Sequence, residues 1–214
     1  MGLIKTLKRK VFKISNFFSN KLFVKNKNIL ITGSNSGIGL ALTKQLVKEN
    51  KILALVNKDS NNLENLKNLK VVQNNFEESR LDNAVLLEIQ KFKPEILINC
   101  AASFGPENQN FKNININEFK LILNINVFGP LELIQETVKL NNLKQIINIT
   151  SEMGSISNNK IGGYYYYRSS KSLLNSISKN LSLDLRKKEI NVFCIHPGDV
   201  KTKINSGGLI APDI

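Results

Sequence analysis

The chain has 214 residues, with 30 lysines and arginines, 17 aspartates and glutamates, one histidine and two cysteines. This length fits one domain with a sizeable core, and a hydrophobic share of 42% excludes a wholly disordered chain. Two cysteines and one histidine exclude a disulfide scaffold and a four-thiolate zinc site, and we expect no metal.

The first 28 residues carry eight basic side chains and no acidic one. Apolar residues recur there at helical spacing, at Leu3, Leu7, Val11, Ile14, Phe18 and Leu22. Residues 1–27 are therefore predicted to be a basic amphipathic extension that could contact an anionic membrane surface through residues 3–22. Two alternatives stay open, a helix docked on its own domain and a disordered extension. No apolar run approaches the roughly 20 residues of a membrane span, so we expect a cytoplasmic protein that is at most peripheral at a membrane.

From residue 28 onward, short apolar runs alternate with helical patterns. The predicted strands are Asn28–Thr32, Ile52–Val56, Lys70–Gln73, Glu95–Asn99, Gln145–Thr150 and Ile190–Ile195. The predicted helices are Gly37–Asn50, a short one over 63–69, Leu81–Phe92, Asn117–Asn141 and Tyr164–Lys188. This alternation predicts one α/β domain over 28–214, a doubly wound, Rossmann-like parallel sheet of about six strands with helices on both faces. Such sheets bind ligands at the carboxyl ends of their strands.

A glycine-rich turn joins the first predicted strand to the first predicted helix. Its sequence is Thr32-Gly33-Ser34-Asn35-Ser36-Gly37-Ile38-Gly39. Glycines let the backbone turn tightly and approach a pyrophosphate, and the free N–H groups at a helix start attract phosphates. The turn therefore predicts a dinucleotide site, although a glycine pattern alone is a weak signal.

A tyrosine and a lysine four residues apart are candidates for proton transfer. Tyr167 and Lys171 lie on one face of a predicted helix, and Tyr167 alone among four consecutive tyrosines has a lysine at this spacing. A neighbouring ammonium should lower the pKa of the phenol, which is near 10 in isolation. Tyr167 could then act as general acid and base on a carbonyl oxygen, with the hydroxyl of Ser151 holding that oxygen.

Taken together, these motifs resemble the short-chain dehydrogenase/reductase family, in its single-domain form and its C-factor-like branch. The resemblance covers about residues 28–208 and adds Asn126 in the long helix, and Pro197-Gly198 followed by Val200 and Thr202. It implies an oxidoreductase that moves a hydride between NAD(P)H and a carbonyl or alcohol substrate. It also implies that Lys171 binds the nicotinamide ribose and that Asn126 holds a water in a proton relay to Lys171. Family members are often oligomers, so a homo-oligomer is possible.

The chain departs from the family at several places. Asn99-Cys100-Ala101-Ala102 replaces the usual Asn-Asn-Ala-Gly, so Asn99 and Ala101 keep their cofactor positions, and Asn75 stands where an aspartate commonly contacts adenine. The family's final helix and seventh strand are expected to be missing after Thr202. We interpret His196 as structural and both cysteines as buried.

The choice of cofactor depends on the end of the second predicted strand. The run Val56-Asn57-Lys58-Asp59 has no acid at the strand end, and Lys58 is placed like the family's NADP-reading arginine. This favours NADP over NAD, unless Lys58 is simply a solvated surface lysine. The alternative to an enzyme is a non-catalytic nucleotide-binding sensor or scaffold at a membrane surface. We expect no specific nucleic-acid binding, and an epimerase or dehydratase is less favoured.

Overall fold

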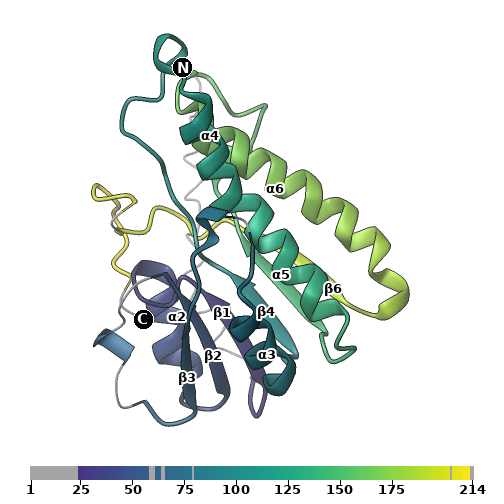
Figure 1. The fold of residues 1–214 in the computed structure, drawn as a ribbon. Helices are drawn as coiled ribbons and strands as arrows, with labels where there is room; N and C mark the ends of the chain where they lie inside the picture. The colour runs from purple at the N-terminus through teal and green to yellow at the C-terminus, as the bar shows by residue number, and fades with distance from the viewer. Residues whose placement is uncertain (1–23, 58–60, 64–65, 79, 203, 213–214) are drawn as a thin grey trace, which may run out of the picture.

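The computed structural model describes residues 24–57, 61–63, 66–78, 80–202 and 204–212 (Figure 1). Six parallel strands form one sheet in the order β3-β2-β1-β4-β5-β6. The strands are β1 Asn28–Thr32, β2 Lys51–Val56, β3 Leu69–Gln73, β4 Ile96–Asn99, β5 Gln145–Ile149 and β6 Asn191–Ile195. The predicted doubly wound sheet is confirmed. Its strand order reverses between β1 and β4, which is where such sheets bind their ligands.

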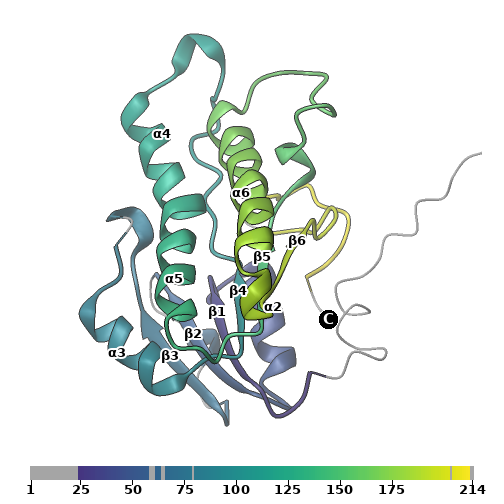
Figure 2. The ribbon, with the colours of Figure 1, turned by 90° about the vertical axis from the view of Figure 1, so that its right-hand side faces the viewer.

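The helices cover the sheet on both faces, as predicted. They are α2 Gly37–Leu46, α3 Asn83–Phe92, α4 Ile116–Leu123, α5 Gly129–Val138 and α6 Tyr165–Asp184. Figure 2 shows α5 and α6 in front of the sheet and α2 behind it. Because successive strand residues point to opposite faces, buried Leu30 joins the core that contains α3 and α5, whereas buried Ile31 joins the core that contains α2.

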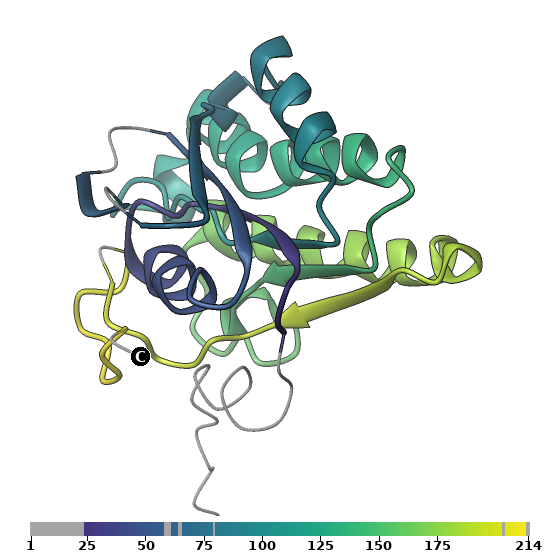
Figure 3. The same cartoon turned by 90° about the horizontal axis from the view of Figure 1, so that it is seen from below.

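The two edge strands, β3 and β6, are more exposed than the four strands between them. In β6, Phe193 and Cys194 are exposed, and Cys100 after β4 is half-buried. The prediction that both cysteines are buried is therefore wrong for Cys194 and holds only in part for Cys100. Figure 3 shows β6 at the side of the sheet away from β3. After β6 the described chain folds back on itself, and Val200 forms a parallel bridge with Ile210.

The predicted helix over 117–141 is divided into three parts. A π-helical turn, η4 Asn124–Phe128, separates α4 from α5, and the N–H of Gly129 bonds to the carbonyl of Asn124, five residues back. Pro130 has no N–H and cannot give the carbonyl of Asn126 its usual helical hydrogen bond. The helix is therefore wider at the turn that carries Asn126.

Other helix boundaries also differ from the prediction. α2 ends at Leu46 rather than Asn50, because the side chain of Asn50 donates to the carbonyls of Val24 and Leu46 and occupies the end of the helix. The short helix expected over 63–69 is, among the described residues, a single 3-10 turn at Asn61–Leu63. α6 ends at Asp184, and a 3-10 turn at Arg186–Lys188 follows it.

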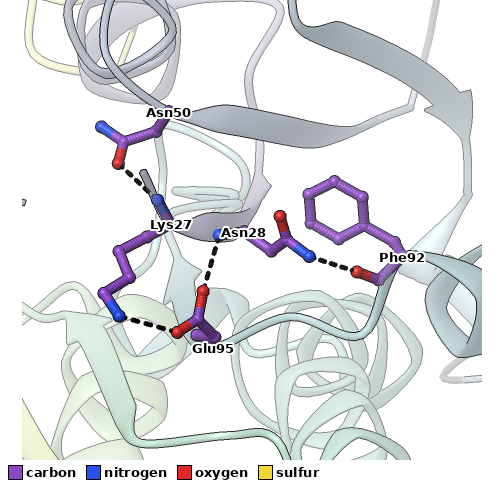
Figure 4. Close-up of polar contacts among 5 residues, drawn as sticks. All are labelled: Lys27, Asn28, Asn50, Phe92 and Glu95. Carbon is purple, nitrogen blue, oxygen red and sulfur yellow. Dashed lines mark hydrogen bonds and ion pairs between the residues drawn. The ribbon is translucent and has the colours of Figure 1, made fainter. Parts of the chain in front are cut away.

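A polar network fixes the amino end of β1 (Figure 4). Glu95 accepts from the Nζ of Lys27 at 2.8 Å and from the backbone N–H of Asn28 at 3.1 Å. The Nδ2 of Asn28 donates to the carbonyl of Phe92, and the N–H of Lys27 donates to Asn50. Partial burial raises the pKa of Glu95, but its two donors lower it further, to below its ordinary value. The network lies at the amino ends of the strands, opposite the carboxyl ends where such sheets bind their ligands.

The predicted extension lies mostly outside the described residues, since only Val24–Lys27 of it belong to them. Those residues pack on the domain: Val24 contacts the core on the α2 face, and the N–H of Asn26 bonds to the carbonyl of Glu49. The membrane contact through residues 3–22 therefore stays a prediction. Within the described part of the chain, no helix is both long and apolar enough to cross a membrane.

Candidate active site

A cleft of about 1730 Å³ opens at the carboxyl edge of the sheet. Its lining comes from the segments that follow β1, β2, β3, β4, β5 and β6, together with the first turns of α2 and α6. The strand order reverses beneath it, between β1 and β4. At that point Thr32 Oγ1 accepts hydrogen bonds at 3.0 Å from the N–H groups of both Cys100 and Ala101, which holds the two strand ends together.

The glycine turn is shaped for a close backbone approach. Gly33 has a φ of +70°, and a Cβ on it would lie 2.8 Å from the backbone of Ala101. A Cβ on Gly39 would lie 2.2 Å from the carbonyl oxygen of Gly33. α2 begins at Gly37 on the cleft wall, and the first N–H groups of a helix have no intrahelical acceptor. This cradle fits an anionic group such as a pyrophosphate.

Most of the predicted cofactor residues line this one cleft. They are Gly33, Asn35, Ser36, Gly37, Ile38, Gly39, Asn75, Ala101, Lys171, Pro197, Gly198, Val200 and Thr202. Ser34 and Asn99 lie behind the cleft wall instead: Ser34 Oγ donates to the carbonyl of Ile31, and Asn99 Nδ2 donates to Asn148. Lys58 lies outside the described residues.

Asn74 is a cleft residue that the sequence analysis missed. It is 2% exposed, and neither its Oδ1 nor its Nδ2 has a hydrogen-bond partner. Its neighbour Asn75 is exposed and accepts from the N–H of Glu77 within a local turn. A buried amide without partners costs free energy unless a ligand satisfies it. Asn74 therefore fits the base-contacting role better than Asn75.

Tyr167 and Lys171 converge on the cleft, as their spacing predicts. Both are buried, and Lys171 Nζ lies 5.6 Å from the centroid of the Tyr167 ring. The same Nζ donates to the carbonyl of Ile149 at 3.0 Å. Burial lowers the pKa of Lys171 to about 8, with partial compensation by Cys100 and Cys194. Lys171 is thus a cation with almost no solvent exposure, next to the last residue of β5.

The pKa of Tyr167 differs from the expectation based on its lysine neighbour. Burial raises this pKa above its ordinary value, a hydrogen bond with Ser151 lowers it in part, and Cys100 raises it further. The ammonium of Lys171 was expected to lower the pKa of Tyr167, but in the protein without cofactor the effect of burial is larger and the pKa is raised. The phenol is therefore protonated at neutral pH and is ready to act as an acid.

Ser151 follows β5 and faces Tyr167 through this hydrogen bond. Its Oγ also accepts from the N–H of Met153 at 3.1 Å, which fixes the rotamer. Behind it, Thr150 Oγ1 donates to Asn175 Oδ1 at 2.6 Å, and Asn148 donates to Ser178 at 2.7 Å. These bonds join β5 and the residue after it to α6, which fixes the positions of Ser151 and Tyr167 relative to each other.

Gln109 anchors the first turn of α6, and sequence reasoning gave no signal for it. This buried side chain accepts at its Oε1 from the N–H groups of Tyr166 and Tyr167, at 3.1 and 3.2 Å. Its Nε2 donates to the carbonyls of Phe104 and Pro106. Gln109 thus satisfies helix N–H groups that would otherwise lack acceptors, and it fixes the backbone of Tyr167.

Asn126 is buried behind the cleft wall, in the π-helical turn. Its Nδ2 donates to the carbonyl of Ser103 and to Ser170 Oγ, both at 2.9 Å, while its Oδ1 accepts from the N–H of Ser103 at 2.8 Å. Both amide hydrogens are therefore bonded to protein. The predicted water relay would have to use the backbone carbonyl of Asn126 or the remaining capacity of Oδ1.

Aromatic and basic side chains form the wall beside Tyr167. The ring centroid of Phe104 lies 4.9 Å from that of Tyr167 and 5.6 Å from that of Tyr164, and Arg168 lines the cleft next to them. Burial raises the pKa of Cys100 to about 12, so this thiol behaves as a small apolar residue. His196 also lines the cleft and accepts from the N–H of Glu152 at 3.3 Å, and its structural interpretation stays a prediction.

Comparisons with known proteins identify one family and several relatives that this chain resembles. The model of the family described as short chain dehydrogenase matches residues 27–208. C-signal of Myxococcus xanthus is 36% identical over 94 residues, which cover 42% of this chain and 57% of that protein. The chain spans between 37% and 58% of the length of the first curated relatives that it matches.

Solved structures share the fold over most of both chains. The carbonyl reductase Sniffer of D. melanogaster has a TM-score of 0.81 at 27% identity and covers 88% of this chain and 87% of its own. The NADPH-bound carbonyl reductase from chicken fatty liver has a TM-score of 0.76 at 25% identity, covering 89% and 86%. A 4-hydroxyisoleucine dehydrogenase complexed with NADH has a TM-score of 0.71 at 30% identity, covering 83% and 78%.

Proposed function

Because the chain belongs to the short-chain dehydrogenase family, we propose that it transfers a hydride between NADP(H) and a carbonyl or alcohol substrate. One observation carries this proposal. Tyr167, Lys171 and Ser151 converge at one end of a cleft whose wall also contains the glycine turn. A protein that only binds a nucleotide has no need of these three groups together.

The cleft offers separate places for the parts of a dinucleotide. The N–H groups at the start of α2 would hold the pyrophosphate, and the unpartnered amide of Asn74 would bond the base. Lys171 would bond the ribose next to the reacting ring. When bound, the cofactor supplies or accepts the hydride, and the chain orients it against the substrate.

The chain's own residues would handle the proton. In reduction, the protonated phenol of Tyr167 gives its proton to the substrate oxygen while the carbonyl carbon receives the hydride, which yields an alcohol. Ser151 would donate a hydrogen bond to the same oxygen and stabilise its developing charge. The raised pKa of Tyr167 favours this direction, because the acid form is already present at neutral pH.

The preference for NADP is a proposal from the sequence. β2 ends at Val56, and Asn57, which lines the cleft, accepts a hydrogen bond from Asn35 of the glycine turn at 3.0 Å. In the sequence, Asn57 rather than an acid that could bond a ribose 2′-hydroxyl follows Val56, and Lys58 comes next. The neighbours named above include both NADPH and NADH complexes.

A panel of aldehydes and ketones, assayed with NADPH and NADH, tests this function. We expect oxidation of NADPH by at least one member of the panel, and tighter binding of NADPH than of NADH by cofactor fluorescence. NADPH binding without turnover on any substrate would favour the non-catalytic sensor or scaffold instead. Tighter binding of NADH would overturn the argument from Lys58.

A further inference from the structure

We infer that Arg168 binds a carboxylate of the substrate, so that the preferred substrates are carbonyl compounds that carry an acid group. The inference rests on the proposed function, because it places this carboxylate in the same cleft as the carbonyl that Tyr167 would protonate. Arg168 directly follows Tyr167 in α6 and lines the same cleft. Its side chain is half-buried and shares the cleft wall with Tyr167 and with residues of the loop over 155–163.

The guanidinium of Arg168 has no anionic partner within the described part of the chain. No described carboxylate lies within 4.0 Å of it, and its Nε is buried without a hydrogen-bond acceptor. Glu152 is an acidic residue of the cleft wall, but it lies beside His196, whose Nε2 is 4.0 Å from Glu152 Oε2. A buried donor without an acceptor is costly, so a ligand that satisfies it binds favourably.

Arg168 is also the cation best placed for this role. Lys171, the other basic residue at this end of the cleft, is 2% exposed and already bonds the carbonyl of Ile149. The guanidinium carbon of Arg168 lies 6.0 Å from the centroid of the Tyr164 ring, within reach of a cation–π contact. The planar fork of a guanidinium matches the two oxygens of a carboxylate.

The neighbouring wall suits the body of such a substrate. The ring of Phe104 contacts the rings of both Tyr164 and Tyr167, and these three residues line the cleft together with Ile161. Aromatic rings bind flat or apolar groups well. The substrate class that fits is therefore an aromatic or apolar aldehyde or ketone with a carboxylate at its far end.

A matched pair of substrates tests the inference. Benzaldehyde and 4-carboxybenzaldehyde differ by one carboxylate, and each would be assayed with NADPH on the parent and on Arg168→Met, Arg168→Lys and Arg186→Met. Arg186 is exposed in the turn after α6 and serves as the control arginine. We expect the parent to prefer the acid, and Arg168→Met to lose about 10- to 100-fold in kcat/KM for it, mostly through KM.

The neutral aldehyde separates recognition from folding. Benzaldehyde turnover should stay within about twofold in Arg168→Met, and Arg168→Lys should recover only part of the preference because it lacks the planar fork. Equal losses on both aldehydes would show that Arg168 only supports the helix, and that outcome would overturn the inference. A parent that shows no preference for the acid would overturn it as well.

Calorimetric titration of benzoate in the presence of NADPH distinguishes failure of this inference from failure of the proposed function. Benzoate that binds the parent but not Arg168→Met supports the carboxylate site even if no aldehyde is reduced. Turnover of both aldehydes with no benzoate binding, or with binding that Arg168→Met leaves intact, would keep the enzyme and reject the site.

Discussion

Lys171 is held as a cation in a place where few solvent contacts support it. Its side chain is 2% exposed, it has a hydrogen bond to one backbone carbonyl, and burial lowers its pKa to about 8. A lysine kept charged under these conditions destabilises the fold. Such a cost is expected where a charged group serves binding or catalysis rather than stability.

Replacing Lys171 with methionine should therefore stabilise the protein while it removes activity. The folded-state pKa of about 8 lies below the ordinary value of 10.5, so the unfolded chain binds the proton more tightly. The penalty is full below pH 8, about 3 kcal/mol at most, and fades as the pH rises towards 10.5. Urea unfolding at pH 7 and pH 9.5 measures it, and we expect Lys171→Met to gain more at pH 7. A gain that grows with pH would show that this charge is not buried.

At the scale of the element, α6 depends on a cap from a distant loop. Two N–H groups in its first turn bond to the side chain of Gln109, whose amide also binds the carbonyls of Phe104 and Pro106. The loop before α4, the aromatic wall and the catalytic helix are thereby joined at one buried residue. Movement of this loop would shift the backbone of Tyr167.

Gln109→Ala should leave buried polar groups without partners and loosen the start of α6. We expect the free energy of unfolding to fall by about 2–4 kcal/mol, because several buried groups lose their hydrogen bonds together. Carbonyl reduction should fall as well, whereas NADPH binding at the glycine turn should change little. Urea unfolding and cofactor titration provide the two measurements. Gln90→Ala, at an exposed position of α3, is the matched control and should be neutral; an equally small effect of Gln109→Ala would contradict the anchoring role.

The elements show where sequence patterns suffice and where they do not. The six strands were predictable because each is a short, mainly apolar run, and all but β5 end at, or within two residues before, a glycine, asparagine or proline. The π-helical turn was not predicted, although Pro130 lies within the helical pattern and removes a donor there. The end of α2 depends on Asn50, whose bonds to Val24 and Lys27 join residues more than 20 positions apart.

The residues of the candidate site also fall into two groups, those that a sequence pattern indicates and those that only the structure brings out. Gly33, Ser151, Tyr167 and Lys171 were predictable because their chemistry is local, in a turn, at a strand end or one helical turn apart. Asn74, Gln109 and Arg168 matter because of what surrounds them in space. Two adjacent asparagines, or an arginine after a tyrosine, give no sequence signal of burial or of a missing partner.

At the scale of the whole molecule, the sheet brings distant segments to one edge. The network around Glu95 fixes the amino ends of β1 and β4, while the glycine turn and the segments after β4, β5 and β6 meet at the opposite edge. The glycine turn from the first half of the chain thus shares one cleft with Ser151, Tyr167 and Lys171 from the second half. Under the proposed function, this one cleft would serve both cofactor binding and proton transfer.

The most direct test of this account compares Tyr167→Phe with Tyr165→Phe in carbonyl reduction and in NADPH binding. Tyr165 lies two residues before Tyr167, is exposed and is not among the residues that line the cleft, so its variant controls for the loss of a phenol in this run of tyrosines. We predict that Tyr167→Phe binds NADPH like the parent and loses at least about 100-fold in kcat, the usual scale of general acid catalysis. Tyr165→Phe should keep the parent rate. Full turnover by Tyr167→Phe would contradict the account.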